Sequence, residues 1–122
     1  MANLLIVEDE PELLHTIADT LEMAGHRCDT ASDGRAALDL FLRGRYDLIV
    51  SDIYMPRKSG TELYQDVRGN GYDGPFVFIT GYAVSEGMPR LRPGRDQLLE
   101  KPFSLTGMVR VVAELLEQRQ PA

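Results

Sequence analysis

The chain has 122 residues and a formal net charge of −6, with 43% apolar residues and a single cysteine, Cys28. This length fits one compact domain, so we expect residues 1–122 to form one folding unit. The acidic balance and the lack of a Lys/Arg cluster argue against direct binding to nucleic acid. A lone cysteine excludes an intramolecular disulfide, and no apolar run approaches the roughly 18 residues of a membrane span. Because the N-terminus also lacks a signal-peptide pattern, we expect a cytoplasmic protein without membrane insertion.

Short apolar runs alternate with segments of helical periodicity along the chain. The run Leu4–Val7 is continuous, as in a strand that is buried on both faces, and Pro11 suits the first turn of a helix. This alternation predicts an α/β domain whose parallel sheet is covered on both sides. Strands are predicted at residues 4–7, 26–31 (a weaker edge strand), 46–50, 76–79 and 98–99, and helices begin near residues 11, 33, 61 and 104.

Each predicted helix carries apolar residues on one face, which we expect to pack against the sheet. These residues are Leu14, Ile17, Leu21 and Ala24 in the first helix, Ala37, Leu38, Phe41 and Leu42 in the second, Leu63, Tyr64 and Val67 in the third, and Leu105, Val109, Val112 and Leu116 in the last. Ser32 or Asp33 is expected to cap the second helix and Ser104 the last.

The segment from Ala83 to Gln97 interrupts the alternation. A helix is expected there, between the fourth and fifth strands, but two prolines and two glycines lie between residues 87 and 94 and oppose it. We therefore predict a short turn or an irregular, mobile segment in place of a regular fourth helix.

Polar and charged residues stand at the carboxyl ends of the predicted strands, where open parallel sheets bind their ligands. Glu8 and Asp9 follow the first strand, Asp52 follows the third, Thr80 ends the fourth, and Lys101 follows the fifth. Because these strand ends meet at one edge of the sheet, we expect the three carboxylates, the hydroxyl and the ammonium group to converge.

This set of groups favours phosphoryl chemistry. Three neighbouring carboxylates raise each other's pKa unless a cation lies among them, and Mg²⁺ prefers oxygen ligands. Lys101 could pair with Asp52 or with a phosphoryl group on it, and Thr80 could donate a hydrogen bond to a phosphoryl oxygen. The assembly suits in-line transfer of a phosphoryl group to the Asp52 carboxylate.

Taken singly, each of these residues also has an ordinary structural interpretation. Glu8 and Asp9 precede a helix, where acids favour the N-terminus. Thr80 could satisfy backbone groups at a strand end, and Lys101 could be a solvated surface residue. The joint pattern, with every residue in its expected place, favours the functional interpretation.

Four motifs resemble those of the response-regulator receiver family. They are Val7-Glu8-Asp9-Glu10, Asp52-Ile53-Tyr54-Met55-Pro56 with Gly60, Thr80-Gly81 and Lys101-Pro102-Phe103. The resemblance covers essentially the whole chain, with the motifs in order and at the family's spacing. It implies a flavodoxin-like, doubly wound, five-stranded parallel sheet of strand order 2-1-3-4-5, and a phosphoacceptor role in two-component signalling.

The resemblance also implies what each matching residue does. Glu8, Asp9 and Asp52 would hold Mg²⁺ together with the backbone carbonyl of Tyr54. Asp52 would accept the phosphoryl group from the phosphohistidine of a sensor histidine kinase or a histidine phosphotransferase. Thr80 would be the switch hydroxyl.

By the same resemblance, Lys101 would act beside the phosphoryl group, and the Lys101–Pro102 bond would be cis. The signal would pass to a downstream protein target through protein contacts. The domain would not be an enzyme beyond catalysing its own phosphorylation and dephosphorylation.

The sequence departs from the family pattern in two places. Leu98 stands where the family usually has an aromatic switch residue, and the helix before it is interrupted. The stretch from Pro75 to Tyr82 is similar to the Pro-Phe-x-Phe-Ala-Thr-Gly-Tyr motif of single-domain receivers paired with kinases of the HWE and related classes, apart from Ile79.

Tyr54 and Tyr82 stand two positions after the acceptor and the switch threonine, where receivers control access of the hydrolytic water. Two bulky side chains that are poor bases near neutral pH predict slow loss of the phosphoryl group.

Three other functions share parts of the pattern. An Asp-dependent phosphohydrolase would need a second Asp where Tyr54 stands. A flavin-binding module would need a Ser/Thr-rich loop where Glu8 and Asp9 would repel the flavin's phosphate. The C-terminal receiver domain of a hybrid sensor histidine kinase would have the same motifs, and this alternative stays open.

Overall fold

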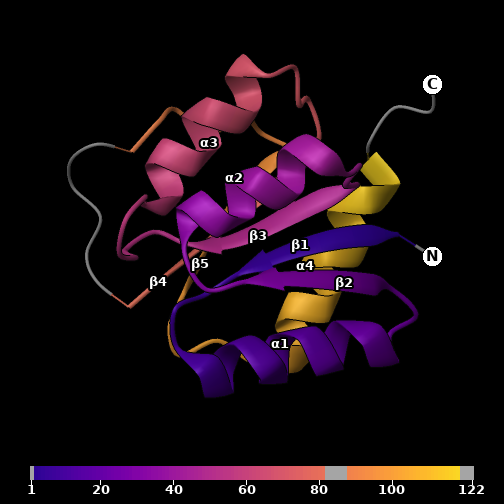
Figure 1. The fold of residues 1–122 in the computed structure, drawn as a ribbon. Helices are drawn as coiled ribbons and strands as arrows, with labels where there is room; N and C mark the ends of the chain where they lie inside the picture. Colours follow the sequence, from indigo (N-terminus) through magenta and orange to yellow (C-terminus); the bar gives the residue numbers. More distant parts are fainter. Residues whose placement is uncertain (1, 82–87, 119–122) are drawn as a thin grey trace.

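The computed structural model describes residues 2–81 and 88–118, and Figure 1 shows a parallel sheet with helices on both faces. The sheet has five strands in the order β2-β1-β3-β4-β5, which is the predicted flavodoxin-like order. None of the helices in these residues is long and apolar enough to cross a lipid bilayer. The strands are β1 (Asn3–Val7), β2 (Arg27–Ala31), β3 (Leu48–Asp52), β4 (Phe76–Thr80) and β5 (Asp96–Glu100), and the helices are α1 (Pro11–Met23), α2 (Gly34–Arg43), α3 (Gly60–Gly69) and α4 (Leu105–Gln118).

The sheet separates two apolar layers. Helices α1 and α4 cover one face and α2 and α3 cover the other (Figure 1). Within β1, Leu4 and Ile6 point into the first layer, and Leu5 and Val7 point into the second. Burial on both faces explains why the interior strands are continuous apolar runs. Strand β2 lies at the edge and is mostly exposed, as its polar sequence predicts.

Side chains at the helix N-termini fix where the helices begin. Asp33 accepts a backbone N–H bond at 2.8 Å and caps α2, as predicted. Ser104 accepts a backbone N–H bond at 2.8 Å at the start of α4, also as predicted. Ser59 and Glu62 form a capping box at the start of α3, which the sequence analysis did not predict.

Several predicted positions differ in the structure. Ala24 is exposed because α1 ends at Met23, so this residue lies beyond the packed face. Leu42 is 57% exposed. It lies about 140° around the helix from the buried Ala37 at about 100° per residue, which turns it away from the sheet. Strand β3 (Leu48–Asp52) begins and ends two residues later than the predicted 46–50, and β5 (Asp96–Glu100) is longer than the predicted 98–99.

The buried face of α4 is centred differently from the prediction. The sequence between residues 105 and 116 is apolar over a wide stripe, so its pattern alone does not define the centre line of the face. Packing against α1 and the sheet decides it. The buried residues are Met108, Val112 and Leu115, whereas Leu105, Val109 and Leu116 are only partly buried.

No helix lies between β4 and β5 in the described residues, which confirms the prediction for residues 88–95. Met88 and Leu91 pack against the apolar layer under α2 and α3, together with Leu98 of β5. The predicted mobility of the whole stretch from Ala83 to Gln97 stays a prediction, since residues 82–87 lie outside the described residues.

A buried carboxylate, Asp96, stands at the start of β5, at the amino edge of the sheet. It accepts hydrogen bonds from the Tyr64 hydroxyl at 2.7 Å, from Arg68 Nη2 at 2.7 Å and from the backbone N–H of Arg92 at 2.9 Å. Arg92 in turn pairs with Asp73 at 3.0 Å. This network joins α3 to the chain that precedes β5.

Candidate functional site

The residues predicted to form the site lie together at the carboxyl edge of the sheet. Glu8 and Asp9 follow β1, Asp52 and Thr80 end β3 and β4, and Lys101 follows β5. The parallel register brings these strand ends level with one another. The convergence expected from the sequence is therefore observed, and parallel pairing is its cause.

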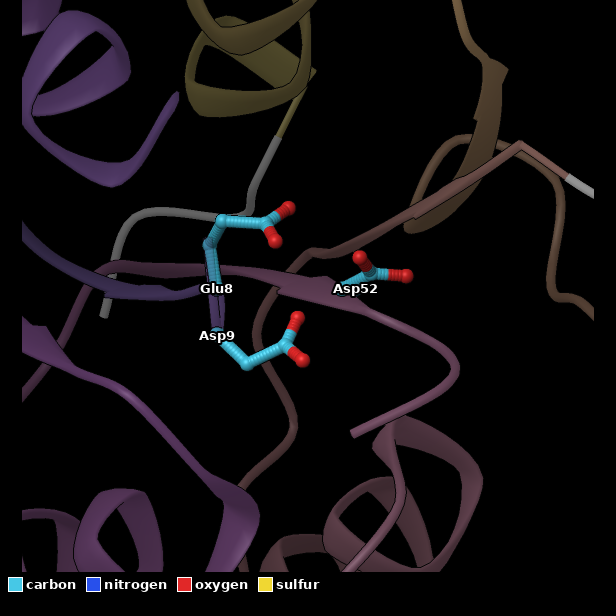
Figure 2. A group of neighbouring side chains, drawn as sticks. All are labelled: Glu8, Asp9 and Asp52. Atoms are coloured by element: carbon cyan, nitrogen blue, oxygen red, sulfur yellow. The ribbon is translucent and has the colours of Figure 1, made fainter. Parts of the chain in front are cut away.

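Three carboxylates form the centre of the site. Figure 2 shows Glu8 and Asp9 reaching from the end of β1 toward Asp52 at the end of β3. One oxygen from each lies within 4.8 Å of the others. Glu8 and Asp52 are buried, whereas Asp9 is exposed. The arrangement therefore presents a buried acidic floor with one side open to solvent.

Glu8 is the most deeply buried of the three. Its Oε2 accepts the backbone N–H of Glu10 at 3.0 Å, and its Oε1 forms an ion pair with Lys101 Nζ at 3.2 Å. Burial raises the pKa of Glu8 to about 7, and the negative charge of Asp52 adds to this rise, while the Glu10 N–H and Lys101 oppose it. This carboxylate is short of positive charge.

Lys101 is the cation of the site. Its Nζ donates to Asp52 Oδ2 at 2.9 Å as well as contacting Glu8. Burial alone lowers the pKa of Lys101, but the hydrogen bond and charge of Asp52, joined by the charge of Glu8, more than offset it and raise the pKa above its ordinary value. The ammonium group is therefore held in its charged form. The Lys101–Pro102 bond is cis, as the resemblance implied.

Thr80 and Tyr54 stand beside these charges. Thr80 is buried at the end of β4, and its carbonyl accepts the Lys101 N–H at 2.7 Å. Tyr54 donates its backbone N–H to Asp52 Oδ1 at 3.3 Å, and its side chain is 45% exposed. Tyr82, the second tyrosine expected to modulate the site, lies outside the described residues.

An open cleft of about 630 Å³ lies over these groups. Acidic residues and Lys101 form its floor, and Tyr54 forms part of its wall. The lining residues are Glu8, Asp9, Glu10, Pro11, Asp52, Tyr54, Gly81 and Lys101. The cleft is large enough to admit a phosphoryl group carried by a partner's side chain.

The donor set fits a hard divalent cation. Its charged ligands are carboxylate oxygens, which Mg²⁺ prefers over nitrogen or sulfur. Three carboxyl groups face the single positive charge of Lys101 among the described groups. An added cation would balance this excess and lower the pKa of Glu8.

Two features of the site were not predicted. The contact between Lys101 and Glu8 was missed because three acids follow β1 and nothing in the sequence selects among them. Gly60 was noted only as part of a motif. A Cβ atom there would lie 2.1 Å from the carbonyl oxygen of Asp52, so only glycine allows α3 to begin this close to the end of β3.

Residues 4–113 match the response regulator receiver domain family. Response regulator MprA from Mycolicibacterium vanbaalenii is 34% identical over 119 residues, which are 97% of this chain and 52% of MprA. Sensor histidine kinase RcsC from Salmonella typhi is 34% identical over 116 residues, which are 94% of this chain and 12% of RcsC. The chain thus spans about half the length of MprA and a smaller share of RcsC.

Solved receiver domains have the same fold. The signal receiver domain of a histidine kinase from Syntrophus aciditrophicus has a TM-score of 0.86 at 25% identity and covers 100% of this chain and 95% of its own. The receiver domain of the hybrid histidine kinase CckA has a TM-score of 0.79 at 30% identity, with 93% and 98% covered. Response regulator TrrA from Thermotoga maritima, in complex with Mg²⁺ and BeF, has a TM-score of 0.81 at 29% identity, with 94% and 99% covered. Together with the family match, these similarities establish that the chain belongs to the response regulator receiver domain family.

Proposed function

We propose that this domain accepts a phosphoryl group on Asp52 from the phosphohistidine of a sensor histidine kinase or a histidine phosphotransferase. It then signals to a downstream protein through protein contacts. The observation that carries the proposal is the surroundings of Asp52: its carboxylate lies beside Glu8 and Asp9 and 2.9 Å from Lys101 Nζ. A carboxylate placed among acids, with one cation at hand, suits a nucleophile in phosphoryl transfer.

In the proposed step, a carboxylate oxygen of Asp52 attacks the phosphorus atom in line with the departing imidazole. The new P–O bond forms as the P–N bond breaks, and the electron pair of the broken bond returns to the histidine nitrogen. No residue of this chain has to remove a proton, because Asp52 attacks as the carboxylate. The step requires that the phosphoryl group be positioned in line with Asp52 and that its negative charge be compensated, rather than a general base.

Lys101 and Thr80 supply two of the contacts that this step requires. Lys101 Nζ already lies between Glu8 and Asp52, so it can pair with a phosphoryl oxygen placed on Asp52. Thr80 ends the neighbouring strand, and its hydroxyl is proposed to donate a hydrogen bond to the phosphoryl group. This bond is formed only when the group is present, which suits a switch.

Glu8, Asp9, Asp52 and the backbone carbonyl of Tyr54 are proposed to hold Mg²⁺. When bound, the ion neutralises negative charge that develops on the phosphoryl oxygens. The all-oxygen donor set supports this assignment, as does the Mg²⁺ and BeF complex of TrrA, a relative of the same fold. The chain's own part is to hold the buried Glu8 and Asp52 carboxyl groups close together at the ends of β1 and β3.

The protein around the domain has two candidate forms. The similarity to MprA supports a response regulator, whereas the similarity to RcsC and CckA supports a receiver domain within a hybrid sensor histidine kinase. The proposed chemistry at Asp52 is the same in both. A cytoplasmic location, a single receiver domain over residues 1–122 and the absence of direct nucleic-acid binding remain proposals.

Intact-mass measurement after incubation with a small acyl phosphate and Mg²⁺ tests the acceptor. We expect one phosphate adduct on the wild type and none on Asp52→Asn. Asp19→Asn, which alters an exposed carboxylate on α1, is the matched control and should be modified like the wild type. An adduct of equal yield on Asp52→Asn would overturn the assignment.

A further inference from the structure

The loop between β3 and α3, residues 53–59, carries the backbone of Tyr54. The base of this loop is closed by two backbone hydrogen bonds. The Ile53 N–H donates to the Ile79 carbonyl at 3.0 Å, and the Gly60 N–H donates to the Ile53 carbonyl at 2.8 Å. Within the loop, the Lys58 N–H donates to the Pro56 carbonyl at 2.8 Å, whereas the Lys58 carbonyl is bonded from outside the loop.

The end of the loop next to α3 contacts the first residue of α2. The Gly34 N–H donates to the carbonyl oxygen of Lys58 at 3.1 Å. A Cβ atom at Gly34 would lie 2.2 Å from that oxygen and 2.8 Å from the Lys58 carbonyl carbon. These are backbone atoms, which cannot rotate away as the tip of a long side chain can. Any larger residue at position 34 must therefore displace the loop or the helix.

The loop also holds a strained residue, which shows that its shape is imposed by its neighbours. Arg57 has a φ of 69°, a left-handed conformation that non-glycine residues rarely adopt. Ion pairs lie on either side of the loop: Arg57 Nε is 3.9 Å from Asp33 Oδ2 at the α2 cap, and Lys58 Nζ pairs with Asp66 of α3. The exposed Arg57 pair is weak, so the buried contact at Gly34 is the principal constraint from α2.

We propose that Gly34 is a positioning residue for the metal-binding loop. This inference rests on the proposed function, since Tyr54 is a proposed ligand. Gly34 touches neither the metal nor the phosphoryl group. It acts through Lys58, because the close approach of α2 sets the position of the Lys58 carbonyl and so the shape of the loop that carries Tyr54. The first turn of α2 therefore supports the site, although the site residues themselves lie at the ends of β1, β3, β4 and β5.

The test compares Gly34→Ala with Gly69→Ala. Gly69 is also in a helix, and a Cβ atom there would meet nothing within 4 Å, so its substitution is the matched control. Isothermal titration with Mg²⁺ alone should show affinity about tenfold weaker for Gly34→Ala, as for other residues that orient metal ligands, and unchanged for Gly69→Ala. A purely structural role predicts lower stability with wild-type affinity in the folded fraction, and that result would overturn the inference.

A measurement on the wild type decides the matter if Gly34→Ala does not fold. By linkage, Mg²⁺ should slow hydrogen exchange of the Gly34 amide more than that of Gly71, whose N–H bonds to Arg68 in a turn after α3. Equal effects of Mg²⁺ on the two amides would contradict a positioning role. A wild type that binds no Mg²⁺ would overturn the proposed function and this inference with it. A wild type that binds Mg²⁺ no better than Gly34→Ala does would overturn the inference alone.

Discussion

The carboxylates at the two edges of the sheet differ in how far the chain compensates their charge. At the carboxyl edge, Glu8, Asp9 and Asp52 lie within 4.8 Å of one another, and Lys101 is the one cation paired with them in the described residues. Burial leaves Glu8 with a pKa raised to about 7 even though Lys101 lies 3.2 Å away. Negative charge is in excess there, and the cleft above it is open.

At the amino edge, a single carboxylate is surrounded by donors. Asp96 receives the Tyr64 hydroxyl, an Arg68 guanidinium and the backbone N–H of Arg92. The Arg68 guanidinium also donates to two backbone carbonyls and lies over the Tyr64 ring at 4.8 Å. Arg68 and Asp96 therefore compensate each other's charge within the chain, although Arg68 Nε has no hydrogen-bond partner among the described residues.

The difference separates a binding site from a structural network in physical terms. A buried charge is tolerated when partners compensate it, and removing one partner is costly. At the amino edge the chain supplies the compensation itself. At the carboxyl edge, part of the charge compensation is left to a ligand. A site that binds a cation and a phosphoryl group requires such an arrangement. Four predictions test or sharpen this contrast, from the largest expected effect to the smallest.

The substitution Asp96→Asn should lower the free energy of unfolding by about 3 kcal/mol, because it leaves a nearly buried Arg68 without its ion-pair partner. The substitution Asp52→Asn, measured without Mg²⁺, should leave stability unchanged or raise it, because Lys101 keeps Glu8 as its partner and one of three crowded carboxyl groups is removed. Urea unfolding of both variants gives the comparison. Equal losses in the two would remove the distinction between the edges.

The substitution Asp9→Asn should weaken Mg²⁺ binding by about tenfold or more while leaving the stability of the metal-free domain intact. At ten times its Kd, Mg²⁺ should stabilise the wild type by about 1.4 kcal/mol, and the variant by less at the same concentration. Titration and thermal unfolding measure the two effects. If Asp9 serves only the N-terminus of α1, stability should fall and the metal affinity should not change.

The substitution Tyr54→Ala should speed loss of the phosphoryl group several-fold. Its half-exposed side chain lines the cleft with Asp52, where it crowds the water that must attack the phosphorus atom. Phosphate decay in the wild type, Tyr54→Ala and Tyr82→Ala measures the effect. If neither truncation speeds decay, both tyrosines must instead serve packing or partner contact.

The substitution Asp73→Asn should have the smallest effect. The hydrogen bond from Arg92 and the charge of Arg95 hold the pKa of Asp73 below its ordinary value, so ionisation of Asp73 favours the folded state. Its contribution should be present above that ordinary value, about 3.9, and should disappear as the pH falls further. Because the pair is exposed, high salt should also remove it. The free energies of unfolding of wild type and variant should therefore become equal at acidic pH and at high salt. A difference that persists at acidic pH would show that ionisation of Asp73 is not its cause.

Much of the candidate site could be predicted because its residues are recognised from their immediate neighbours in the sequence. Glu8, Asp52 and Lys101 each stand directly at or after the end of an apolar run, and parallel strands must bring such ends to one edge. The missing helix between β4 and β5 was likewise predictable in residues 88–95, since prolines and glycines oppose helix formation wherever they occur.

The sequence by itself determined the order of the strands' apolar runs, a cap at Ser32 or Asp33 and another at Ser104, and the set of chemical groups at the carboxyl edge. The structure selected Asp33. The tertiary structure alone decided which charges are compensated. Asp96 looks like an ordinary polar residue before Leu98, and its partners Arg68 and Tyr64 lie 28 and 32 residues away. Gly34 likewise shows no role until folding places it against Lys58. Burial and pairing of this kind depend on which distant segments meet, and that is a property of the packed chain rather than of any local pattern.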